Sequence, residues 1–267
     1  MQIQEIQAKS IIAPSKIPSC DYAINPYTGC QHSCIYCYAD YMGFYSGHCE
    51  PWGQFVDVKI NGAELIDDCQ KYRGQEIMFS SVTDAYQPIE KKYKLTRQIL
   101  EKLVPCQPKI TILTKSTLVT RDIDILKQFE NVQVGFSLIT TNPEHQKMLE
   151  PGANSPSERL EALAQLKTAG IKTSIFVAPI LPYFTKLEDI IKAGADRADY
   201  FLFDAFNRKS SKKVLSFIAK SYPQWLPKYE YVLRDENYKE YKSKLKEHID
   251  KLMIEYKIKG KILFSGK

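Results

Sequence analysis

The feature of this sequence that most constrains its fold is an alternation of short apolar runs with longer segments of helical periodicity. Five runs, too short for helices, are predicted to be strands at residues 76–81, 109–114, 132–139, 172–178 and 200–204. The segments around them are predicted to be helices, at 63–73, 89–104, 122–129, 157–169 and 187–195. Such alternation is typical of βα units on a parallel sheet. With a first strand ending near Asn25, the count of strands is too low for a closed eight-stranded barrel.

The rest of the chain flanks this α/β region on both sides. Residues 1–19 are predicted to be an extended N-terminal arm, residues 20–206 the barrel domain, and residues 207–267 a C-terminal extension packed on the barrel. The extension is expected to hold helices at 210–221 and 238–256, with Pro223 and Pro227 breaking the chain between them. At 267 residues, 44% of them hydrophobic, the chain can bury a large core, so one main domain is expected.

The sequence lacks the patterns of exported and membrane proteins. No run approaches the ~18 apolar residues of a membrane span, and the start lacks the charged-then-apolar pattern of a signal peptide. We therefore expect a soluble, cytoplasmic protein with no membrane partner. In that compartment the seven cysteines should be reduced, and four scattered ones are interpreted as small buried hydrophobes: Cys20, Cys49, Cys69 and Cys106.

The residues that point most directly to chemistry are Cys30, Cys34 and Cys37, spaced C-x3-C-x2-C. Three thiolates can hold three irons of a [4Fe-4S] cube. Because the sequence has no fourth cysteine at a matching spacing, one iron would stay open for another ligand. A structural zinc site is the alternative, although zinc ligands usually come as two pairs. Its candidate fourth ligands are His32, His48 and Cys49.

This triplet, with Tyr36 just before its last cysteine, resembles the radical SAM superfamily. The longer stretch NPYTGCQHSCIYCYA, residues 25–39, is similar to the group that contains spore photoproduct lyase and proteins labelled DNA repair photolyase. Further matching motifs lie at residues 51–53, 82–90, 96–97, 112–116, 121–122, 150–152, 159–160 and 178–182. The resemblance implies a partial (β/α)6 barrel of the TIM type and a [4Fe-4S] cluster on the three cysteines. It also implies that S-adenosyl-L-methionine chelates the open iron through its amino and carboxylate groups.

The matching motifs follow predicted strands, and in parallel barrels functional groups gather at the carboxyl ends of the strands. Asp84 with Thr83, after the second strand, suits the ammonium of the cofactor. Lys115, after the third strand, suits its carboxylate. Similar residues have these roles in the family, and the alternative for Lys115 is a plain surface lysine.

The resemblance assigns three further residues to the nucleoside part of the cofactor. Ser137, near the end of the fourth predicted strand, is placed at the ribose, and Tyr36 and Ala178 are placed near adenine. Plain packing is the alternative for Tyr36 and Ala178.

The resemblance also implies how the reaction begins. A one-electron reductant, such as a flavodoxin or ferredoxin, reduces the cluster, which passes the electron to the sulfonium of S-adenosyl-L-methionine. A C–S bond then breaks to give a 5′-deoxyadenosyl radical, which abstracts hydrogen from the substrate. The cofactor supplies this chemistry, and the protein supplies position and shielding. An irregular excursion at residues 40–62 is expected to cover the site.

One position departs from the lyases. They carry a cysteine hydrogen donor three residues before the aspartate that aligns with Asp84, where this chain has Ser81. A serine O–H bond is too strong to replace a thiol in returning a hydrogen to a carbon radical. Tyr38 resembles a tyrosine implicated in radical transfer in the lyases and is the alternative catalytic donor. We therefore expect a lyase-like member of the wider group, without thymine-dimer repair as its activity.

The C-terminal extension is basic. Residues 207–267 hold 16 Lys and Arg against 7 Asp and Glu, whereas the whole chain has 37 against 31. Aromatic side chains beside cations can stack bases while lysines neutralise phosphates, so DNA or RNA is a candidate partner. The alternative is a solvated lysine-rich face with its aromatic residues packing inward. These residues are Tyr222, Trp225, Tyr229, Tyr231, Tyr238 and Tyr241.

Two hypotheses of function follow from the sequence. The first is a radical SAM enzyme acting on an unidentified substrate, with nucleic acid as the candidate class. The second is a nucleic-acid-binding protein whose iron–sulfur cluster is structural or sensory. Glu150, Arg121 and Arg159 recur with the family motifs and have no assigned role, and His145 and His248 are interpreted as structural.

Overall fold

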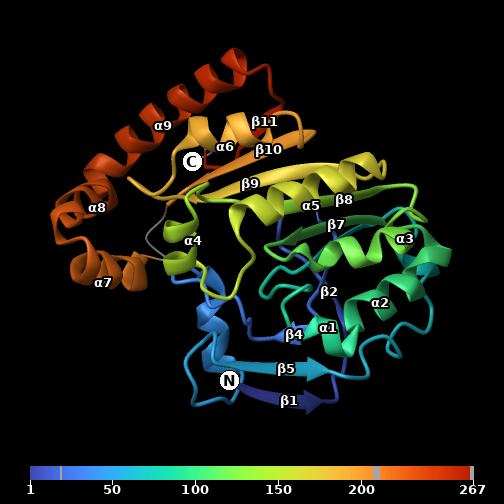
Figure 1. Cartoon of the computed structure of the whole chain (residues 1–267). Helices are drawn as coiled ribbons and strands as arrows, with labels where there is room; N and C mark the ends of the chain where they lie inside the picture. The colour runs from blue at the N-terminus through green and yellow to red at the C-terminus, as the bar shows by residue number, and fades with distance from the viewer. Residues whose placement is uncertain (19, 207–210, 265–267) are drawn as a thin grey trace.

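The computed structural model describes residues 1–18, 20–206 and 211–264. Its centre is an eight-stranded sheet (Figure 1). All neighbours from β3 to β11 pair in parallel, and β2 pairs antiparallel with β3. Within the described residues no pairing joins β2 to β11, so the barrel is open. In sheet order the strands are β11 (Gly260–Ile262), β10 (Tyr200–Ala205), β9 (Lys172–Ile180), β8 (Val132–Ser137), β7 (Lys109–Thr114), β6 (Glu76–Phe79), β3 (Tyr22–Ile24) and β2 (Ile12–Pro14).

The six strands predicted for the barrel, β3 and β6 to β10, are confirmed, with ends displaced by two residues or fewer. Their apolar side chains fill the main core, because a parallel sheet is covered on both faces. β11 is a further parallel strand that the sequence does not predict. It is only three residues long and carries a single large apolar side chain, Ile262, so it has no periodic pattern.

Helices between the strands cover the sheet. α5 begins with a capping box, in which Ser155 and Glu158 each accept a hydrogen bond from the other's backbone N–H. α4 is capped by Asn142, whose side chain accepts hydrogen bonds from two backbone N–H groups of the first turn. The bounds of these helices are α1 (Glu90–Tyr93), α2 (Leu95–Leu103), α3 (Ile123–Leu126), α4 (Pro143–Leu149), α5 (Pro156–Thr168) and α6 (Leu187–Gly194).

The N-terminal arm is part of a second, smaller sheet rather than a free extension. β1 (Gln2–Ile6) pairs in parallel with β5 (Phe55–Lys59), which pairs antiparallel with β4 (Tyr27–Thr28). The side chains of β5 are buried, whereas those of β1 are exposed along most of its length. The polar sequence of β1 therefore gives no sign of its pairing. In Figure 1 this sheet lies at the bottom, below the larger one.

The helix predicted at residues 63–73 is wrong. This segment consists of turns and one short 3-10 helix, Gln70–Tyr72. Polar side chains here bond to backbone groups and compete with a helix. Asp68 accepts a hydrogen bond from the N–H of Gln70 at 2.9 Å, and Asn61 bonds to both the N–H and the C=O of Ala8.

Two cysteines that the sequence suggests are separate reduced thiols are instead paired. Cys69 and Cys106 form a disulfide, with their Cα atoms 5.7 Å apart. A short 3-10 helix, Val104–Cys106, follows α2. The disulfide joins the last residue of this helix to the turns after β5. The other cysteines, including the triplet, carry free thiols.

The C-terminal residues pack on the barrel at the left of Figure 1, beside the carboxyl ends of β9 and β10. They form α7 (Ser211–Ser221), α8 (Leu226–Leu233) and α9 (Asp235–Glu255). α7 and α9 correspond to the predicted helices at 210–221 and 238–256, except that residue 210 lies outside the described residues. α7 and α8 share a second apolar cluster with loops of the barrel, whose members include Tyr36, Leu149, Leu181, Phe184, Val214, Ile218, Tyr229 and Val232.

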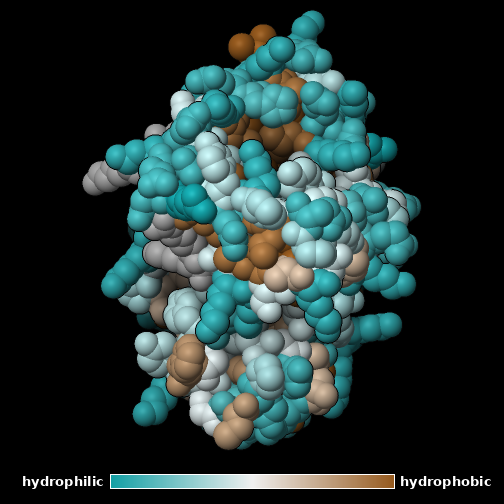
Figure 2. All heavy atoms as spheres, turned by 90° about the vertical axis from the view of Figure 1, so that its left-hand side faces the viewer, coloured by the Kyte–Doolittle hydropathy of each residue, from teal (hydrophilic) through white to brown (hydrophobic). Residues whose placement is uncertain are grey.

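The surface of this side of the molecule mixes apolar and polar areas. Figure 2, which views the molecule from the left of Figure 1, shows apolar surface in the middle of the face, ringed by hydrophilic side chains. Among the described residues, no helix combines the length and apolar character needed to cross a membrane. The division of the chain into arm, barrel and extension domains stays a prediction.

Candidate active site

The segment after β6 fixes the first half of the cysteine loop, which we define as residues 29–37. Thr83 Oγ1 donates a hydrogen bond to the carbonyl of Gly29 at 2.5 Å, and Gln87 Nε2 donates to the same oxygen at 3.3 Å. The Gln87 side chain also accepts a hydrogen bond from the N–H of Gln31 at 2.8 Å. Since Gln87 is fully buried, this part of the loop is bonded to the barrel rather than to solvent.

A second segment, which we name the strap (residues 149–152), runs along the other side of the loop. The N–H of Ile35 donates to the carbonyl of Leu149 at 3.0 Å, and the N–H of Gly152 donates to the carbonyl of His32 at 3.1 Å. A Cβ atom on Gly152 would lie 2.0 Å from the carbonyl oxygen of Gln31. Only glycine therefore allows the strap to approach this closely.

The Pro51–Gly53 motif lies in the segment that follows the cysteine loop and packs against the loop. Gly53 has φ +96°, and a Cβ there would lie 2.3 Å from Ser33 Oγ. Burial raises the pKa of the Cys37 thiol, and a hydrogen bond from the Trp52 side chain opposes that rise. The motif that accompanies the triplet in the sequence is thus in contact with it.

Asp84 is the buried centre of the site. Its carboxylate accepts hydrogen bonds from Thr114 Oγ1 at 2.7 Å, from the N–H of Tyr86 at 2.9 Å and from the N–H of Lys115 at 2.9 Å. His32 Nε2 lies 3.1 Å from the same carboxylate. Burial raises the pKa of Asp84, but His32, Thr114 and the Lys115 N–H outweigh it and hold the pKa at about 2. Asp84 is therefore ionised at neutral pH.

His32 connects Asp84 to the strap. Its Nδ1 lies 2.9 Å from the carbonyl oxygen of Gly152, and its Nε2 faces the carboxylate of Asp84. Both neighbours are acceptor oxygens, so each ring nitrogen lies against an oxygen atom. The predicted contacts of Asp84 and Thr83 with the cofactor's ammonium would thus compete with hydrogen bonds that brace the cysteine loop. Those contacts stay a prediction.

A second buried group links the cysteine loop to the end of β8. The hydroxyl of Tyr36 donates to Glu150, whose carboxylate pairs with Arg159 Nη2 at 2.5 Å. Arg159 Nη1 in turn donates to the carbonyl of Ser137 at 2.9 Å. Glu150 and Arg159 are no more than 1% exposed. Glu150 and Arg159, to which the sequence assigns no role, thus link two predicted cofactor residues. These are Tyr36, predicted near adenine, and Ser137, predicted at the ribose.

The thiols and Lys115 form the charged part of the site. Burial raises the pKa of Cys30, Cys34 and Cys37, that of Cys34 to about 12, and Lys115 opposes the rise at Cys34 and Cys37. Burial lowers the pKa of Lys115, but Cys34, Glu150 and Asp84 outweigh it and raise the pKa above its usual value. The Lys115 ammonium lies 5.7 Å from the centre of the Tyr36 ring. As thiolates, these three partly buried groups next to a single lysine would need further positive charge, and this donor set suits the cationic core of an iron–sulfur cluster.

The candidate fourth ligands for zinc have other partners. His48 Nε2 lies 2.7 Å from Asp57 and its ring stacks on Phe55, while His32 is held between Asp84 and the strap. Cys49 is exposed. Within the part of the chain that the structure describes, no three His, Cys, Asp or Glu side chains form a ready site for a metal ion.

The structure brings Tyr38 to Ser81, the position at which the chain departs from the lyases. Its hydroxyl donates to the backbone carbonyl of Ser81, and its side chain is 56% exposed. Burial of the hydroxyl end raises the pKa of Tyr38, so the phenol keeps its proton at neutral pH. A protonated phenol is the form that could give up a hydrogen atom.

The remaining predicted residues lie at the ends of neighbouring strands. Thr114, just before Lys115, is in register with Phe136 of β8, and Ser137 is in register with Phe176 of β9, two residues before Ala178. Lys115, Ser137 and Ala178 therefore lie at one edge of the sheet with the cysteine loop. Their individual cofactor contacts stay predictions.

The comparison with protein families decides the identity of this arrangement. The family described as the radical SAM superfamily matches residues 24–193. The chain belongs to the radical SAM superfamily. Its three cysteines, strand-end lysine and braced loop are thus parts of a radical SAM protein.

Relatives of this radical SAM protein occur in archaea, bacteria and phages. An uncharacterized protein of Methanocaldococcus jannaschii is 39% identical, over 84% of this chain and 85% of the relative. An uncharacterized protein of Mycobacterium tuberculosis is 28% identical, over 96% of this chain and 81% of the relative. A Pseudomonas phage M6 protein named "Radical SAM Nalpha-GlyT isomerase" is 33% identical over 62% of this chain, but only 34% of the relative.

Among solved structures, spore photoproduct lyase has the same fold. The lyase complexed with dinucleoside spore photoproduct superimposes with a TM-score of 0.70 at 20% identity, covering 97% of this chain and 81% of the lyase. A lyase variant with bound AdoMet gives a TM-score of 0.69 at 19% identity, with the same coverage. This likeness confirms the mixed α/β fold with an open, parallel barrel.

A further charged network of the radical SAM protein lies under the chain that leads into the cysteine loop. Tyr27 donates a hydrogen bond to the fully buried Glu90, and Arg121 bridges Glu90 and Asp122 at 2.7 Å each. Arg97 pairs with Asp122 at 3.1 Å. The network gives Arg121 a structural role, since it bonds to Glu90 of α1, whose carboxylate also accepts the hydrogen bond from Tyr27 of β4.

Sequence reasoning missed the bracing roles of Gln87, Glu150, Gly152 and Arg159. Their partners are far away in sequence, as in the 114 residues between Tyr36 and Glu150. The available signal was the presence of these polar residues and glycines inside the matching motifs. That signal marks them as important without indicating what they contact.

Proposed function

We propose that this radical SAM protein is an enzyme that holds a [4Fe-4S] cluster on Cys30, Cys34 and Cys37 and cleaves S-adenosyl-L-methionine. When bound and reduced, the cluster and cofactor supply a 5′-deoxyadenosyl radical, which removes hydrogen from the substrate. The observation that carries the proposal is the family match together with three partly buried thiols on a loop braced from both sides next to Lys115. A flavodoxin or ferredoxin is the reductant that we propose.

The chain's own residues have distinct tasks in this proposal. Lys115 holds the carboxylate of the cofactor, and Thr83 and Asp84 hold its ammonium in exchange for contacts that brace the cysteine loop. Tyr36 and Ala178 enclose adenine, and Ser137 binds the ribose. The pair of Glu150 and Arg159 keeps Tyr36 and the end of β8 at a fixed distance.

We propose nucleic acid as the substrate class. The support is the fold shared with a lyase complexed with a dinucleoside photoproduct and the basic composition of residues 207–267. Ser81 in place of a cysteine donor argues against thymine-dimer repair. Tyr38, hydrogen-bonded at Ser81, is the donor that we propose to return a hydrogen atom to the substrate radical.

Anaerobic reconstitution tests the enzyme proposal directly. The full chain should take up about four irons, and dithionite with S-adenosyl-L-methionine should then yield 5′-deoxyadenosine. Replacing any one of the three cysteines by alanine should abolish the product. Absence of 5′-deoxyadenosine from protein with an intact cluster would reject the proposal.

A second candidate function is nucleic-acid binding with a structural or sensory cluster. The observation that favours it is the excess of 16 cationic over 7 anionic residues in 207–267. Salt-dependent binding that persists after removal of cluster and cofactor, without any cofactor cleavage, would support this function over the first.

A further inference from the structure

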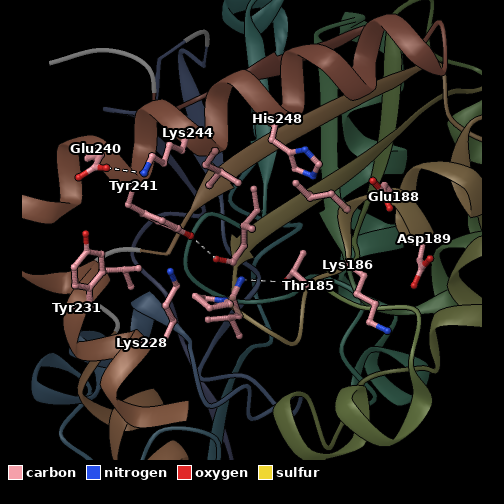
Figure 3. A pocket seen from close by; sticks show the side chains of 16 residues that line it. Thr185, Lys186, Glu188, Asp189, Lys228, Tyr231, Glu240, Tyr241, Lys244 and His248 are labelled. Carbon is pink, nitrogen blue, oxygen red and sulfur yellow. Dashed lines mark hydrogen bonds and ion pairs between the residues drawn. The ribbon is translucent and has the colours of Figure 1, made fainter. Parts of the chain in front are cut away.

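A cavity of about 660 Å³ lies between the barrel and the C-terminal helices, outside the cysteine loop (Figure 3). One wall is the chain from the end of β9 to the first turn of α6, and the other walls are α8 and α9. Its volume lies within the range of small-ligand sites. None of the roles described for the cofactor involves this cavity.

One end of the cavity is cationic. In Figure 3 the Lys228 side chain rises between Tyr231 and Tyr241, and its ammonium lies 5.5 Å from the centre of the Tyr231 ring. Lys228 has no ion-pair partner among the residues that the structure describes, whereas nearby Lys244 is paired with Glu240 at 2.6 Å. Lys228 is therefore the cation at this end that is available to an anionic ligand.

The opposite end of the cavity offers acceptors. Glu188 and Asp189 lie in the first turn of α6, apart from Lys228 in Figure 3, and Lys186, just before that helix, lies beside Asp189. Apolar side chains such as Leu187 and Leu245 also line the cavity. A ligand that matches this lining has an anionic group at one end and N–H donors at the other.

An aromatic stack stands beside the cationic end. Tyr183, in the loop after β9, stacks on Trp225 with ring centroids 4.9 Å apart, and Trp225 stacks on Tyr222 at 4.3 Å with ring planes 7° apart. Phe184, which is 1% exposed, packs edge-on against Trp225 and Tyr222. Trp225 and Lys228 are three residues apart, so the stack and the cation share one short stretch of chain.

Tyr183 is the open end of the stack. Half of the residue is exposed, although it is a large aromatic residue held by a rigid neighbour. Its backbone is left-handed, with φ 65°, a conformation that is rare for bulky residues and costs free energy. Strained conformations of this kind concentrate at ligand sites, where they aim a side chain. Here the strain presents a flat ring to solvent.

We infer that Tyr183 with its stack and the Lys228 end of the cavity form a binding surface for single-stranded nucleic acid. A base stacks on the Tyr183 ring, and a backbone phosphate is neutralised by Lys228. Glu188 and Asp189 accept hydrogen bonds from N–H groups of a second base, such as the ring N–H of thymine. This inference rests on the nucleic-acid substrate proposed above. It places the bound nucleic-acid strand on a surface outside the cysteine-loop site.

The surface is connected to the cysteine loop through the second apolar cluster. Phe184, under the stack, shares this cluster with Leu149 of the strap and with Tyr36 of the loop. His145 of α4, the helix that leads into the strap, also packs edge-on against Phe184 at 4.9 Å. A strand on Tyr183 is therefore fixed to the same packed unit that positions the cysteine loop.

Fluorescence anisotropy with a labelled single-stranded oligothymidine and the anaerobically reconstituted full chain tests the stacking. Tyr183→Asn removes the ring, and asparagine tolerates the left-handed backbone, whereas Tyr183→Phe keeps the ring. We expect Tyr183→Asn to weaken binding about tenfold or more and Tyr183→Phe to bind like the wild type. Abasic residues in the oligonucleotide should weaken wild-type binding and leave Tyr183→Asn unaffected.

A salt titration tests the phosphate contact. Lys228→Ala should lower the slope of log K against log salt concentration by about 1, while the matched Lys127→Ala, an exposed lysine outside this surface, should not. Wild-type affinity and salt slope in both Tyr183→Asn and Lys228→Ala would overturn the surface and leave the substrate class standing. Failure of the wild type to bind oligothymidine, or its preference for a mixed-charge peptide, would overturn both. Formation of 5′-deoxyadenosine without substrate reports separately on the radical chemistry.

Discussion

Gly152 is the residue whose identity is most strictly set by the cysteine loop. Because a Cβ there would lie 2.0 Å from the Gln31 carbonyl oxygen, Gly152→Ala must push the strap and the loop apart. We expect the variant to fold but to bind much less iron than the wild type after anaerobic reconstitution. Gly43→Ala is the matched control, since its added methyl group would meet no atom within 4 Å. Full iron loading of Gly152→Ala would show that the loop tolerates the displacement.

Glu150 is a buried carboxylate, and its ion-pair partner Arg159 is buried as well. Glu150→Gln leaves Arg159 as an uncompensated buried charge, and losing one partner of such a pair costs about 3–5 kcal/mol. The free energy of unfolding, measured by denaturant titration under anaerobic conditions, should fall by this amount. Glu161→Gln, an exposed position on α5, should change it by less than about 0.5 kcal/mol. Equal stability of the two variants would contradict the structural role of the pair.

Asp84 gives the folded protein a defined dependence on acid. Its pKa is lowered from 3.8 to about 2 in the folded state, so its ionised form stabilises the fold above pH 4, and this contribution is lost as the pH falls toward 2. The contribution amounts to about 2 kcal/mol. Asp84→Asn in metal-free protein should lose it at neutral pH and show a flatter stability profile in acid. Asp196→Asn, at an exposed site, should keep the wild-type profile.

At the scale of elements, the barrel strands are predictable because their signal is local. Runs such as β7 are apolar over a length that suits a strand and no helix. β1 and the turns at residues 63–73 are not predictable in this way. β1 is polar and pairs with a strand about fifty residues away, and the turns are set by Asp68, Asn61 and a disulfide. Strand pairing and side-chain contacts between residues distant in sequence leave no periodic pattern in that sequence.

The disulfide between the turns after β5 and the end of α2 is testable by counting thiols. Metal-free protein, denatured without reductant, should expose five free thiols, because Cys69 and Cys106 are paired. All seven cysteines should react after reduction. The Cys106→Ala variant, denatured without reductant, should show the same five reactive thiols and in addition that of Cys69, which has lost its partner. Seven reactive thiols in the unreduced wild type would show that the bond does not form.

At the scale of the whole molecule, the C-terminal helices complete the barrel's packing. Val214, Ile218 and Val232 supply much of the second apolar cluster, so deletion of residues 207–267 would expose the apolar side chains of Leu181 and Phe184. We expect the truncated chain to aggregate, as measured by size-exclusion chromatography. The full chain with exposed α9 lysines changed to glutamine should stay monodisperse. A truncated chain that remains monodisperse and melts cooperatively would instead support separate domains.

The candidate site was predictable at this scale only as a set of motifs. The cysteines, Asp84, Lys115 and Ser137 lie on one edge of the sheet, as the strand order implies. Which of them face a cofactor and which brace the loop depends on packing between segments, as with Asp84, and could not be read from spacing. The sequence shows the excess of cations in the extension, but nothing in it marks Tyr183, in the loop after β9, as an outward-facing ring.

β11 has a consequence for how the protein matures on the ribosome. The strand that pairs with β10 on this side is made from Gly260–Ile262, which follow β10 (Tyr200–Ala205) only after the intervening helices α7 to α9. Until these residues leave the exit tunnel, the hydrogen-bonding edge of β10 is unpaired, and unpaired edges invite association between chains. The edge of β10 is therefore paired only once Gly260–Ile262 have been synthesised. Because the cysteine loop precedes β10 and β11 in the sequence, it is synthesised before this edge of the sheet is paired.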